Sequence, residues 1–326
     1  MEGTTHRIFN LAFLGCGLAT RIHSKVLSRF HKDFRLYYAS RDKAKADSFN
    51  RKFKGSGSFG TYKDAIDSPN IDIVLIATPP AQHLELALRA MEARKNVIVE
   101  KPPFLHSSDF ETIRKFQEKT DCRVFVAENY YYKPLVSKLR EIIGSGWIGE
   151  ILFVHVNALK QQEPLDWRNN PKLAGGGSLF EGGIHWVNFV SNLGLQVKAF
   201  HGFRPGRKDG MERSLMVNLE YAGGAVGTLY YSWEIPSLLR GIRLSRIYGR
   251  KGSITFESNG LFILVSGSSF RLILPDLKDL SGHKAMFRDF LHSLRSGKEP
   301  EMSLDLAEKD LKSVESIYHS MEERIP

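Results

Sequence analysis

Cysteine is scarce in this chain, because only Cys16 and Cys122 occur among its 326 residues. Two cysteines give neither a disulfide framework nor the ligand spacing of a metal site, which favours a reducing, cytoplasmic setting. Long apolar runs are also missing: the longest, such as residues 73–77, fall far short of the roughly 20 residues that cross a bilayer. These absences exclude a disulfide-rich secreted scaffold and predict that the protein has no membrane partner.

The sequence also has no run of five or six like charges and no internal repeat. It is nevertheless basic, with 46 Lys and Arg against 36 Asp and Glu and a formal net charge of +10. Nucleic acid is one candidate partner for such a chain. The basic residues are interspersed with acids, as in Arg41-Asp42-Lys43, so we expect a solvated surface and a small anionic ligand rather than nucleic acid.

The first twenty residues allow two interpretations. His6 and Arg7, an apolar run and then Gly15-Cys16 resemble a bacterial lipoprotein signal. Asn10 interrupts that run and the basic region is thin. We favour the second interpretation, in which the run is a buried strand followed by a glycine turn.

Up to about residue 128 the chain alternates between short apolar runs and amphipathic helical periods, such as Leu18, Ile22, Val26 and Phe30. This alternation is typical of a parallel sheet covered by crossover helices. The expected strands are 8–14, 34–39, 71–77, 96–100 and 123–127. We therefore predict a doubly wound α/β domain of the Rossmann type over residues 1–128.

The pattern changes after residue 129. A helix is expected over 134–143, a strand over 151–158, and a helix over 178–193 after a polar Gly/Pro stretch at 160–177. Strand-like segments separated by glycine turns fill 196–274 and predict an antiparallel sheet. With helices over 283–294 and 304–321, the last one capped by Ser303, residues 129–326 form the predicted α+β domain.

A glycine turn follows the first strand directly. Gly15 permits a tight turn, and Gly17 lets a pyrophosphate approach the N-terminus of the next helix, where N–H groups favour anions. Thr20 stands where the third glycine of the dinucleotide fingerprint is expected, so an ordinary strand-to-helix turn is the alternative.

Ser40-Arg41 closes the second strand, where an acid would hold the ribose of NAD. A small residue with a nearby arginine suits the 2′-phosphate of NADP, and NADP is therefore the predicted cofactor, with NAD the other candidate. Alternatively, Ser40 is only a helix N-cap and Arg41 a solvated side chain.

Polar residues also end two central strands, at the edge where open α/β sheets bind ligands. Glu100 and Lys101 follow the strand at 96–100, and Thr78-Pro79-Pro80 with His83 follows the strand before it. Taken alone, Lys101 could be a surface lysine, but its place at a strand end favours function.

Glu181 and His185 lie four residues apart in the glycine-rich stretch 175–186, on one face of the expected helix. A carboxylate there can orient an imidazole and raise its basicity. Gly182 and Gly183 predict close approach to the backbone, by a ligand or by a packed helix with Glu181 and His185 merely an exposed ion pair.

Together these motifs, with His23, Trp167-Arg168 and Glu-Lys-Pro at 100–102, resemble the glucose-fructose oxidoreductase / inositol dehydrogenase / rhizopine catabolism (Gfo/Idh/MocA) family over essentially the whole chain. The resemblance implies a Rossmann domain and an α+β domain whose sheet often forms a homodimer or homotetramer. It implies that Lys101 and His185 are catalytic, and that Glu181 stands where relatives carry aspartate. The residues expected to bind the cofactor are Gly15, Gly17, Leu18, Ala19, Thr20, Ser40, Arg41, Thr78, Pro79, His83, Glu100, Lys101 and Arg168.

The resemblance implies an NADP-dependent oxidoreductase that moves hydride between nicotinamide and a secondary alcohol or ketone of a sugar, cyclitol or related polyol. Two alternatives stay open. One is a non-catalytic dinucleotide-binding regulator on the same fold, because fold does not imply function. The other is an NAD-dependent glycosidase that oxidises its substrate transiently and shows no net cofactor reduction.

Overall fold

The computed structural model describes residues 7–164, 166–206, 209–236 and 241–322, so His6 of the signal-like segment lies outside the described residues. The chain divides into two compact units. The first contains the residues up to 127 and 286–307, and the second contains 128–285 and the residues from 308 onward. Residues 286–307, expected in the second domain, belong to the first unit, where Phe290 packs against Phe125 with ring centroids 4.9 Å apart.

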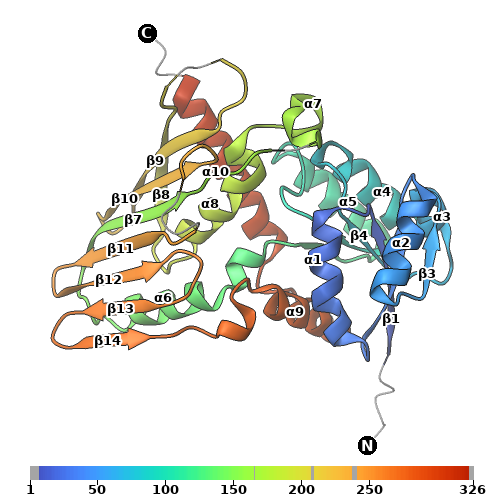
Figure 1. Cartoon of the computed structure of the whole chain (residues 1–326), viewed down its shortest axis with the longest axis horizontal. Coiled ribbons are helices and arrows are strands. Elements are labelled where there is room, and N and C mark those ends of the chain that lie inside the picture. Colours follow the sequence, from blue (N-terminus) through green and yellow to red (C-terminus); the bar gives the residue numbers. More distant parts are fainter. Residues whose placement is uncertain (1–6, 165, 207–208, 237–240, 323–326) are drawn as a thin grey trace, which may run out of the picture. The chain divides into compact units, whose positions relative to one another are not determined.

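The first unit is built on a six-stranded parallel sheet in the order β3-β2-β1-β4-β5-β6 (Figure 1). The strands are β1 (Phe9–Leu14), β2 (Phe34–Ala39), β3 (Gly57–Phe59), β4 (Ile73–Ile76), β5 (Asn96–Val99) and β6 (Val124–Val126). The doubly wound fold and its five expected strands are confirmed. The sequence did not reveal β3, because three half-buried residues carry too little periodicity.

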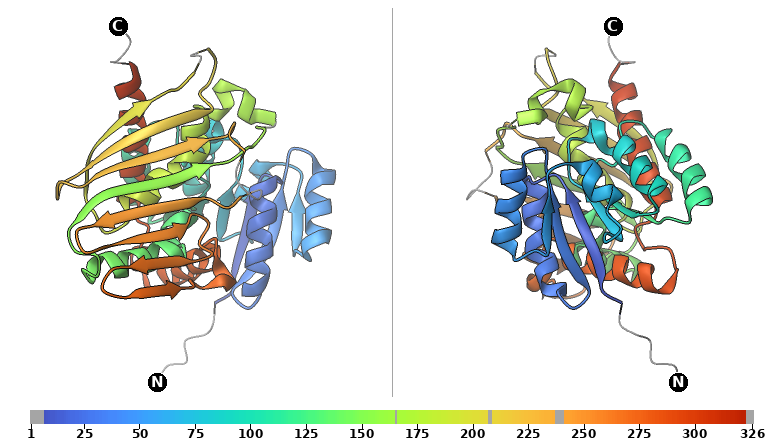
Figure 2. Two further views of the ribbon diagram at one scale, coloured as in Figure 1. Left: turned by 60° about the vertical axis from the view of Figure 1, so that its left-hand side comes forward. Right: turned by 90° about the vertical axis from the view of Figure 1, so that its right-hand side faces the viewer.

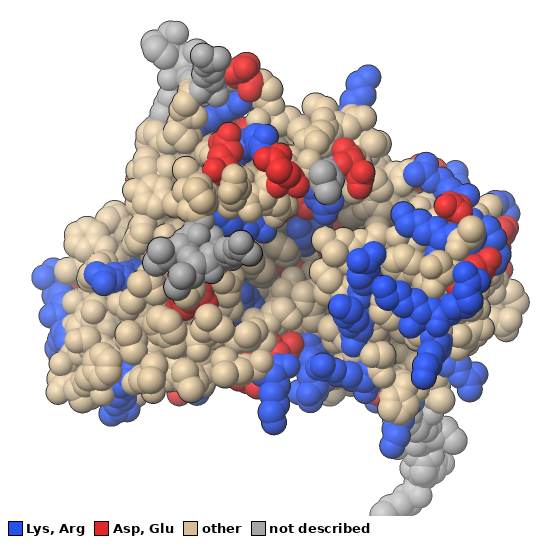
Figure 3. Space-filling model, viewed as in Figure 1, with Lys and Arg blue, Asp and Glu red and all other residues tan. Residues whose placement is uncertain are grey.

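Short helices connect these strands, and each buries an apolar stripe while its polar face meets water. They are α1 (Leu18–Leu27), η1 (Ser28–Phe30), α2 (Lys43–Phe53), α3 (Tyr62–Asp67), η2 (Pro80–Gln82), α4 (His83–Glu92) and α5 (Asp109–Thr120). Most of α9 (His283–Ser296) also belongs to this unit, although it connects none of these strands. Figure 3 shows Lys and Arg side chains gathered over the surface that α1 and α2 form. In α2, Lys43 pairs with Asp47.

The second unit contains an eight-stranded sheet in the order β14-β13-β12-β11-β7-β10-β9-β8. Only β7 and β10 pair in parallel among these neighbours, so the sheet is mostly antiparallel, as predicted. The strands are β7 (Ile151–Leu159), β8 (Val197–Phe203), β9 (Ser214–Tyr221), β10 (Val226–Ser232), β11 (Leu244–Gly249), β12 (Gly252–Glu257), β13 (Ile263–Ser266) and β14 (Phe270–Ile273).

Helices cover one face of this sheet, and the other face is open (Figure 2). Exposed apolar side chains of the sheet include Phe153, Val226 and Tyr248. The remaining elements are η3 (Asn129–Tyr132), α6 (Pro134–Gly144), η4 (Asp166–Asn169), α7 (Pro171–Ala174), η5 (Leu179–Gly183), α8 (Ile184–Ser191), η6 (Leu277–Asp279) and α10 (Leu304–Glu322). The expected cap of α10 is present, because the Ser303 hydroxyl accepts a hydrogen bond from the Leu306 amide at 3.3 Å.

The expected helix over 178–193 has two parts. Its first turn, η5, is a π-helix, and α8 continues from Ile184. Both cysteines are free and buried. In the described part of the chain, no helix is long and apolar enough to span a membrane.

Candidate functional site

The turn between β1 and α1 has the geometry of a phosphate cradle. Gly15 adopts φ +107°, and a Cβ there would lie 2.7 Å from the Ala77 carbonyl oxygen, so only glycine fits. A Cβ at Gly17 would meet nothing within 4 Å, and no side chain caps the N-terminus of α1. The first amides of α1, at Leu18 and Ala19, therefore open on a space that suits a pyrophosphate.

Thr20, the departure from the glycine fingerprint, has a structural role. Its hydroxyl donates a 2.6 Å hydrogen bond to the Gly15 carbonyl, and the side chain is fully buried. The hydroxyl thus closes the glycine turn on itself. This contact explains how the turn keeps its shape without a third glycine.

Ser40 and Arg41 follow β2, but neither caps α2. The N-cap is Asp42, whose carboxylate accepts from the Lys45 amide at 3.2 Å, while the Ser40 hydroxyl accepts from the Asp42 amide at 3.2 Å. The N-cap alternative for Ser40 is therefore wrong. Arg41 is exposed, and its side chain hydrogen-bonds that of Tyr62.

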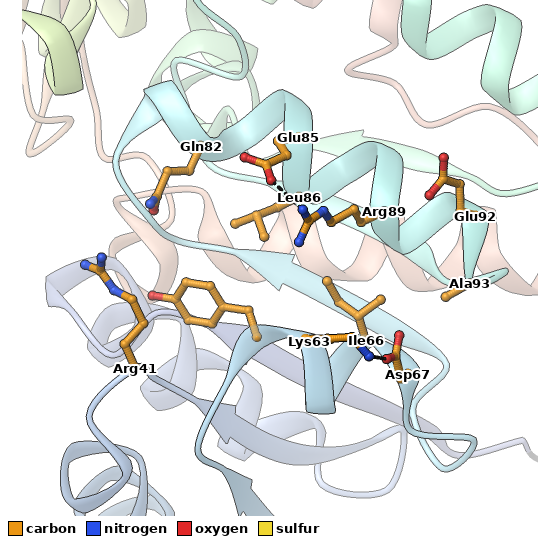
Figure 4. Close-up of a pocket in the computed structure, with 11 residues that line it drawn as sticks. Arg41, Lys63, Ile66, Asp67, Gln82, Glu85, Leu86, Arg89, Glu92 and Ala93 are labelled. Atoms are coloured by element: carbon orange, nitrogen blue, oxygen red, sulfur yellow. Dashed lines mark hydrogen bonds and ion pairs between the residues drawn. The ribbon is translucent and has the colours of Figure 1, made fainter.

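Arg41 lines a cavity of about 630 Å³ between α3 and α4 (Figure 4). Tyr62, Gln82 and Leu86 line the same cavity. The pKa of Tyr62 is raised, because burial outweighs the opposing effect of the adjacent Arg41 guanidinium. The lining combines apolar side chains with charged residues of both signs, which include Lys63, Asp67, Glu85, Arg89 and Glu92.

His83, expected to bind cofactor, instead ties two strand ends together. Its Nε2 lies 2.9 Å from the Thr78 carbonyl oxygen, and its Nδ1 lies 3.0 Å from the carbonyl of Pro102 and 3.2 Å from that of Pro103. The ring is 1% exposed, and burial lowers its pKa. His83 therefore holds the loops that carry Thr78, Pro79 and Lys101 and cannot itself reach a ligand.

Glu100 holds the end of β5 in a similar way. One carboxylate oxygen lies against Nε2 of the buried His23 in α1, and the other accepts from the Lys101 amide at 3.1 Å. The Lys101-Pro102 peptide bond is cis. These contacts fix the backbone from which the Lys101 side chain projects.

In the second unit, His185 contacts a carboxylate that the sequence did not single out. Nδ1 of His185 lies 2.6 Å and 2.8 Å from the two carboxylate oxygens of Glu128. Glu128 is 2% exposed. The contact makes a buried carboxylate–imidazole pair, in which Nδ1–H donates to Glu128.

The 3₁₀ turn after Glu128 forms the surroundings of this imidazole. The Tyr130 ring stacks on His185 with centroids 4.4 Å apart, and the buried Lys133 ammonium lies 4.3 Å from the centre of the same tyrosine ring. Burial raises the pKa of Tyr130 to about 12. The pKa of Lys133 is lowered to about 8, mainly by burial and also by the positive charge of Arg243. Tyr130 thus stays protonated and serves as a platform for His185.

Packing, rather than a ligand, explains the glycines of η5. A Cβ at Gly182 would lie 2.2 Å from the Tyr231 hydroxyl oxygen, and a Cβ at Gly183 would lie 2.9 Å from Cδ1 of Leu179. Tyr231 belongs to β10 and its hydroxyl accepts from the Trp233 indole at 2.9 Å. The close approach predicted from the sequence is therefore an intrachain contact.

Glu181, predicted to orient His185, contacts Arg168. Its carboxylate accepts a 2.9 Å hydrogen bond from Nε of Arg168, and the residue is 7% exposed. Glu181 lies in the π-turn η5, where i→i+5 winding differs from the α-helical spacing that the sequence suggested. No motif in the sequence marked Glu128 as a functional residue. Its position directly after the last strand of the Rossmann sheet was the only indication.

Comparison with known proteins identifies the family. Residues 9–128 match the oxidoreductase family with an NAD-binding Rossmann fold, and residues 136–255 match the GFO/IDH/MocA C-terminal domain. Levoglucosan dehydrogenase of Pseudarthrobacter phenanthrenivorans is 25% identical over 289 residues, covering 77% of this chain and 71% of that protein. A trans-1,2-dihydrobenzene-1,2-diol dehydrogenase of Danio rerio is 24% identical over 253 residues, covering 73% and 71%.

Solved structures show the same fold. A levoglucosan dehydrogenase complex with NADH and levoglucosan superposes with a TM-score of 0.85 at 22% identity, covering 97% of this chain and 98% of that one. The aldose-aldose oxidoreductase of Caulobacter crescentus, complexed with glycerol, gives 0.84 at 24% identity with the same coverage. The two family matches together span most of the chain, from β1 into β12. The chain therefore belongs to the GFO/IDH/MocA family of oxidoreductases with an NAD-binding Rossmann domain.

Proposed function

We propose that this protein is an NADP-dependent dehydrogenase or reductase that acts on a secondary alcohol or ketone of a sugar, cyclitol or related polyol. The observation that carries the proposal is the buried Glu128–His185 pair in a chain whose first unit has an open glycine cradle. The names of the relatives, which include sugar and diol dehydrogenases, support the substrate class.

Several residues would hold the dinucleotide. The amides after Gly17 suit its pyrophosphate, and Arg41 suits a 2′-phosphate, for which no competing acid stands at Ser40. When bound, nicotinamide supplies the hydride acceptor or donor at its C4 atom. The protein must position the reacting C–H group and manage the hydroxyl proton.

His185 manages that proton. With Nδ1–H donated to Glu128, Nε2 would accept the proton, and general-base catalysis of this kind is typically worth 10²- to 10⁴-fold. The ammonium of Lys101 would stabilise negative charge that develops on a substrate oxygen, as a donor of an oxyanion hole does.

Cofactor preference is tested by titration. We expect NADP to bind at least about tenfold tighter than NAD, a difference of about 1.4 kcal/mol, because Arg41 can pair with the 2′-phosphate. Ser40→Asp combined with Arg41→Ala should abolish the preference. Equal affinities for both cofactors in the wild-type enzyme would overturn the NADP assignment while leaving the reaction class intact.

Activity is tested by net NADP reduction with a polyol library that includes levoglucosan. Lys101→Ala and His185→Ala should each lower kcat at least about a hundredfold with little change in NADP affinity. His201→Ala, an exposed histidine in β8, is the matched control. Product formation without net reduction would favour the glycosidase, and cofactor binding without any turnover would favour the regulator.

We also propose that the open face of the large sheet joins copies of this chain. Tyr248, Phe153 and Val226 stand side by side in register across β11, β7 and β10, and all are more than a third exposed. A continuous apolar strip on a soluble surface marks an interaction site. Light scattering should show a dimer or tetramer, and Phe153→Glu should dissociate it.

Two free thiols favour a cytoplasmic enzyme.

A further inference from the structure

We propose that Glu181 is a positioning residue that latches the loop at 160–174 through Arg168. In this role it acts through Arg168, whereas Glu128 is in contact with Nδ1 of His185. The inference rests on the proposed function, because it assigns the loop to polyol binding. It also gives Arg168 a part other than the cofactor contact that the resemblance implies.

The geometry separates the two carboxylates. Glu128 has both oxygens within 2.8 Å of Nδ1 of His185, whereas Glu181 accepts from Arg168 at 2.9 Å. The Glu181 side chain is 10% exposed and that of Arg168 is 25% exposed. The guanidinium also lies 4.5 Å from the centre of the Trp167 ring. Glu181 thus holds a cation and, through it, an aromatic side chain.

Backbone contacts already fix the two ends of the loop. The Lys160 amide donates to the Ser232 carbonyl at 3.0 Å and the Gln162 amide to that of Trp233 at 2.8 Å, which joins the start of the loop to the end of β10. At the other end, the Asn170 side chain caps α7 by accepting from the Lys172 amide at 3.1 Å.

The turn η4, which carries Trp167 and Arg168, lies between these anchors. Asn169 ties it to the loop itself by donating to the Pro164 carbonyl at 2.8 Å. The Arg168–Glu181 pair connects it to η5, the π-turn immediately before α8 and His185. This pair therefore sets where Trp167 lies relative to the helix that carries the proposed base.

The π-turn is itself clamped, which makes Glu181 a fixed anchor. Glu212 accepts from the Leu179 amide at 3.0 Å and from the Tyr318 hydroxyl at 2.7 Å, and that hydroxyl accepts from the Phe180 amide at 3.2 Å. A Cβ at Gly177 would lie 1.9 Å from a Glu212 carboxylate oxygen, so glycine is required there.

The length of the glutamate side chain decides the outcome. Aspartate at 181 would retract the carboxylate by about one C–C bond, roughly 1.5 Å, and would take it beyond hydrogen-bond reach of Nε of Arg168. The Arg168–Glu181 contact therefore depends on the length of the glutamate side chain.

Hydrogen exchange tests the latch without any substrate. In Glu181→Asp, the amides of residues 166–175 should exchange at least about tenfold faster than in the wild type, while peptides from β9 and β10 stay unchanged. Glu163→Asp is the matched control, because Glu163 lies in the same loop and makes an exposed ion pair with Arg213 at 3.3 Å. Unchanged exchange at 166–175 in Glu181→Asp would overturn the proposal.

Kinetics with the best polyol of the screen provide the second test. Glu181→Asp and Arg168→Gln should each raise the KM for that polyol at least about fivefold with kcat within twofold, and their NADP affinity should not change. Glu181→Gln combined with Arg168→Gln should be no worse than Arg168→Gln alone. A fall in kcat for Glu181→Gln that persists in the Arg168→Gln background would instead make Glu181 the acid that orients His185. Absence of turnover in the wild type would reject the proposed function and leave the exchange test of the latch intact.

Discussion

At the scale of single residues, the pairing of Glu128 with His185 determines which imidazole nitrogen can do chemistry. A carboxylate on Nδ1 fixes the ring orientation and holds the proton on that atom. Its negative charge also stabilises the imidazolium that forms once Nε2 has taken a proton. The Tyr130 ring, stacked on the imidazole, limits rotation of the ring out of this position.

Glu128→Gln should therefore lower kcat by about 10- to 100-fold and move the acidic limb of the kcat/KM profile to lower pH by about one unit. The shift is downward because removing a neighbouring negative charge lowers the pKa of an imidazole. A pH series of initial rates with NADP measures both effects. Glu163→Gln, which alters an exposed carboxylate, should leave the profile in place. An acidic limb that does not move in Glu128→Gln would contradict the pairing.

At the scale of elements, the π-turn η5 depends on two glycines, because side chains of the neighbouring strand and of the turn itself leave no room for a Cβ atom. Gly182 faces the Tyr231 hydroxyl of β10, and Gly183 faces Leu179. A normal α-turn with larger residues would carry Glu181 and His185 on one face, as the sequence suggested. The packing of β10 against the turn thus requires glycine at 182.

Gly182→Ala should destabilise the protein by about 2 kcal/mol, because its Cβ would lie 2.2 Å from the Tyr231 hydroxyl oxygen. The next nearest atom, Cζ of Tyr231, is 3.4 Å away, so removing the hydroxyl removes the clash. Tyr231→Phe alone should cost about 1 kcal/mol through the lost Trp233 hydrogen bond. In urea unfolding, the double variant should be more stable than the sum of the two single effects. Simple additivity would show that another contact limits residue 182.

At the scale of the whole molecule, ionisable groups buried in the second unit make stability depend on pH. Asp310 in α10 is 3% exposed and accepts from the Asn188 amide at 2.7 Å. Burial raises the pKa of Asp310 well above its ordinary value. In the folded state this carboxyl therefore keeps its proton at pH values where the unfolded chain has lost it.

A raised folded-state pKa gives stability that is complete below the unfolded pKa of about 3.9 and is lost as the pH rises toward the folded value. Asp310→Asn has no proton to lose, so its free energy of unfolding relative to the wild type should be higher at pH 8 than at pH 5. Urea denaturation at the two pH values measures this difference. Asp305→Asn, an exposed position in the same helix, is the control. A constant difference between variant and wild type would exclude proton uptake at Asp310.

The sequence by itself determined the elements and the places where function is concentrated. Alternation of apolar runs and helical periods is a local property, and it predicted five of the six strands of the parallel sheet. The glycine turn at 15–17, Ser40-Arg41 and Lys101 were predicted at strand ends, where the topology of a doubly wound sheet gathers ligands. The short β3 and the π-turn escaped because neither has a periodic signature.

Only the tertiary structure decided which charged groups meet. Glu128 and His185 are 57 residues apart and Arg168 and Glu181 are 13 apart, so no helical or strand spacing connects either pair. The same holds for residues 286–307, whose apolar face fits the first unit although the chain reaches it from the second. Local periodicity fixes secondary structure, whereas the partner of a buried carboxylate depends on how distant elements pack, and that packing assigned His185 to Glu128.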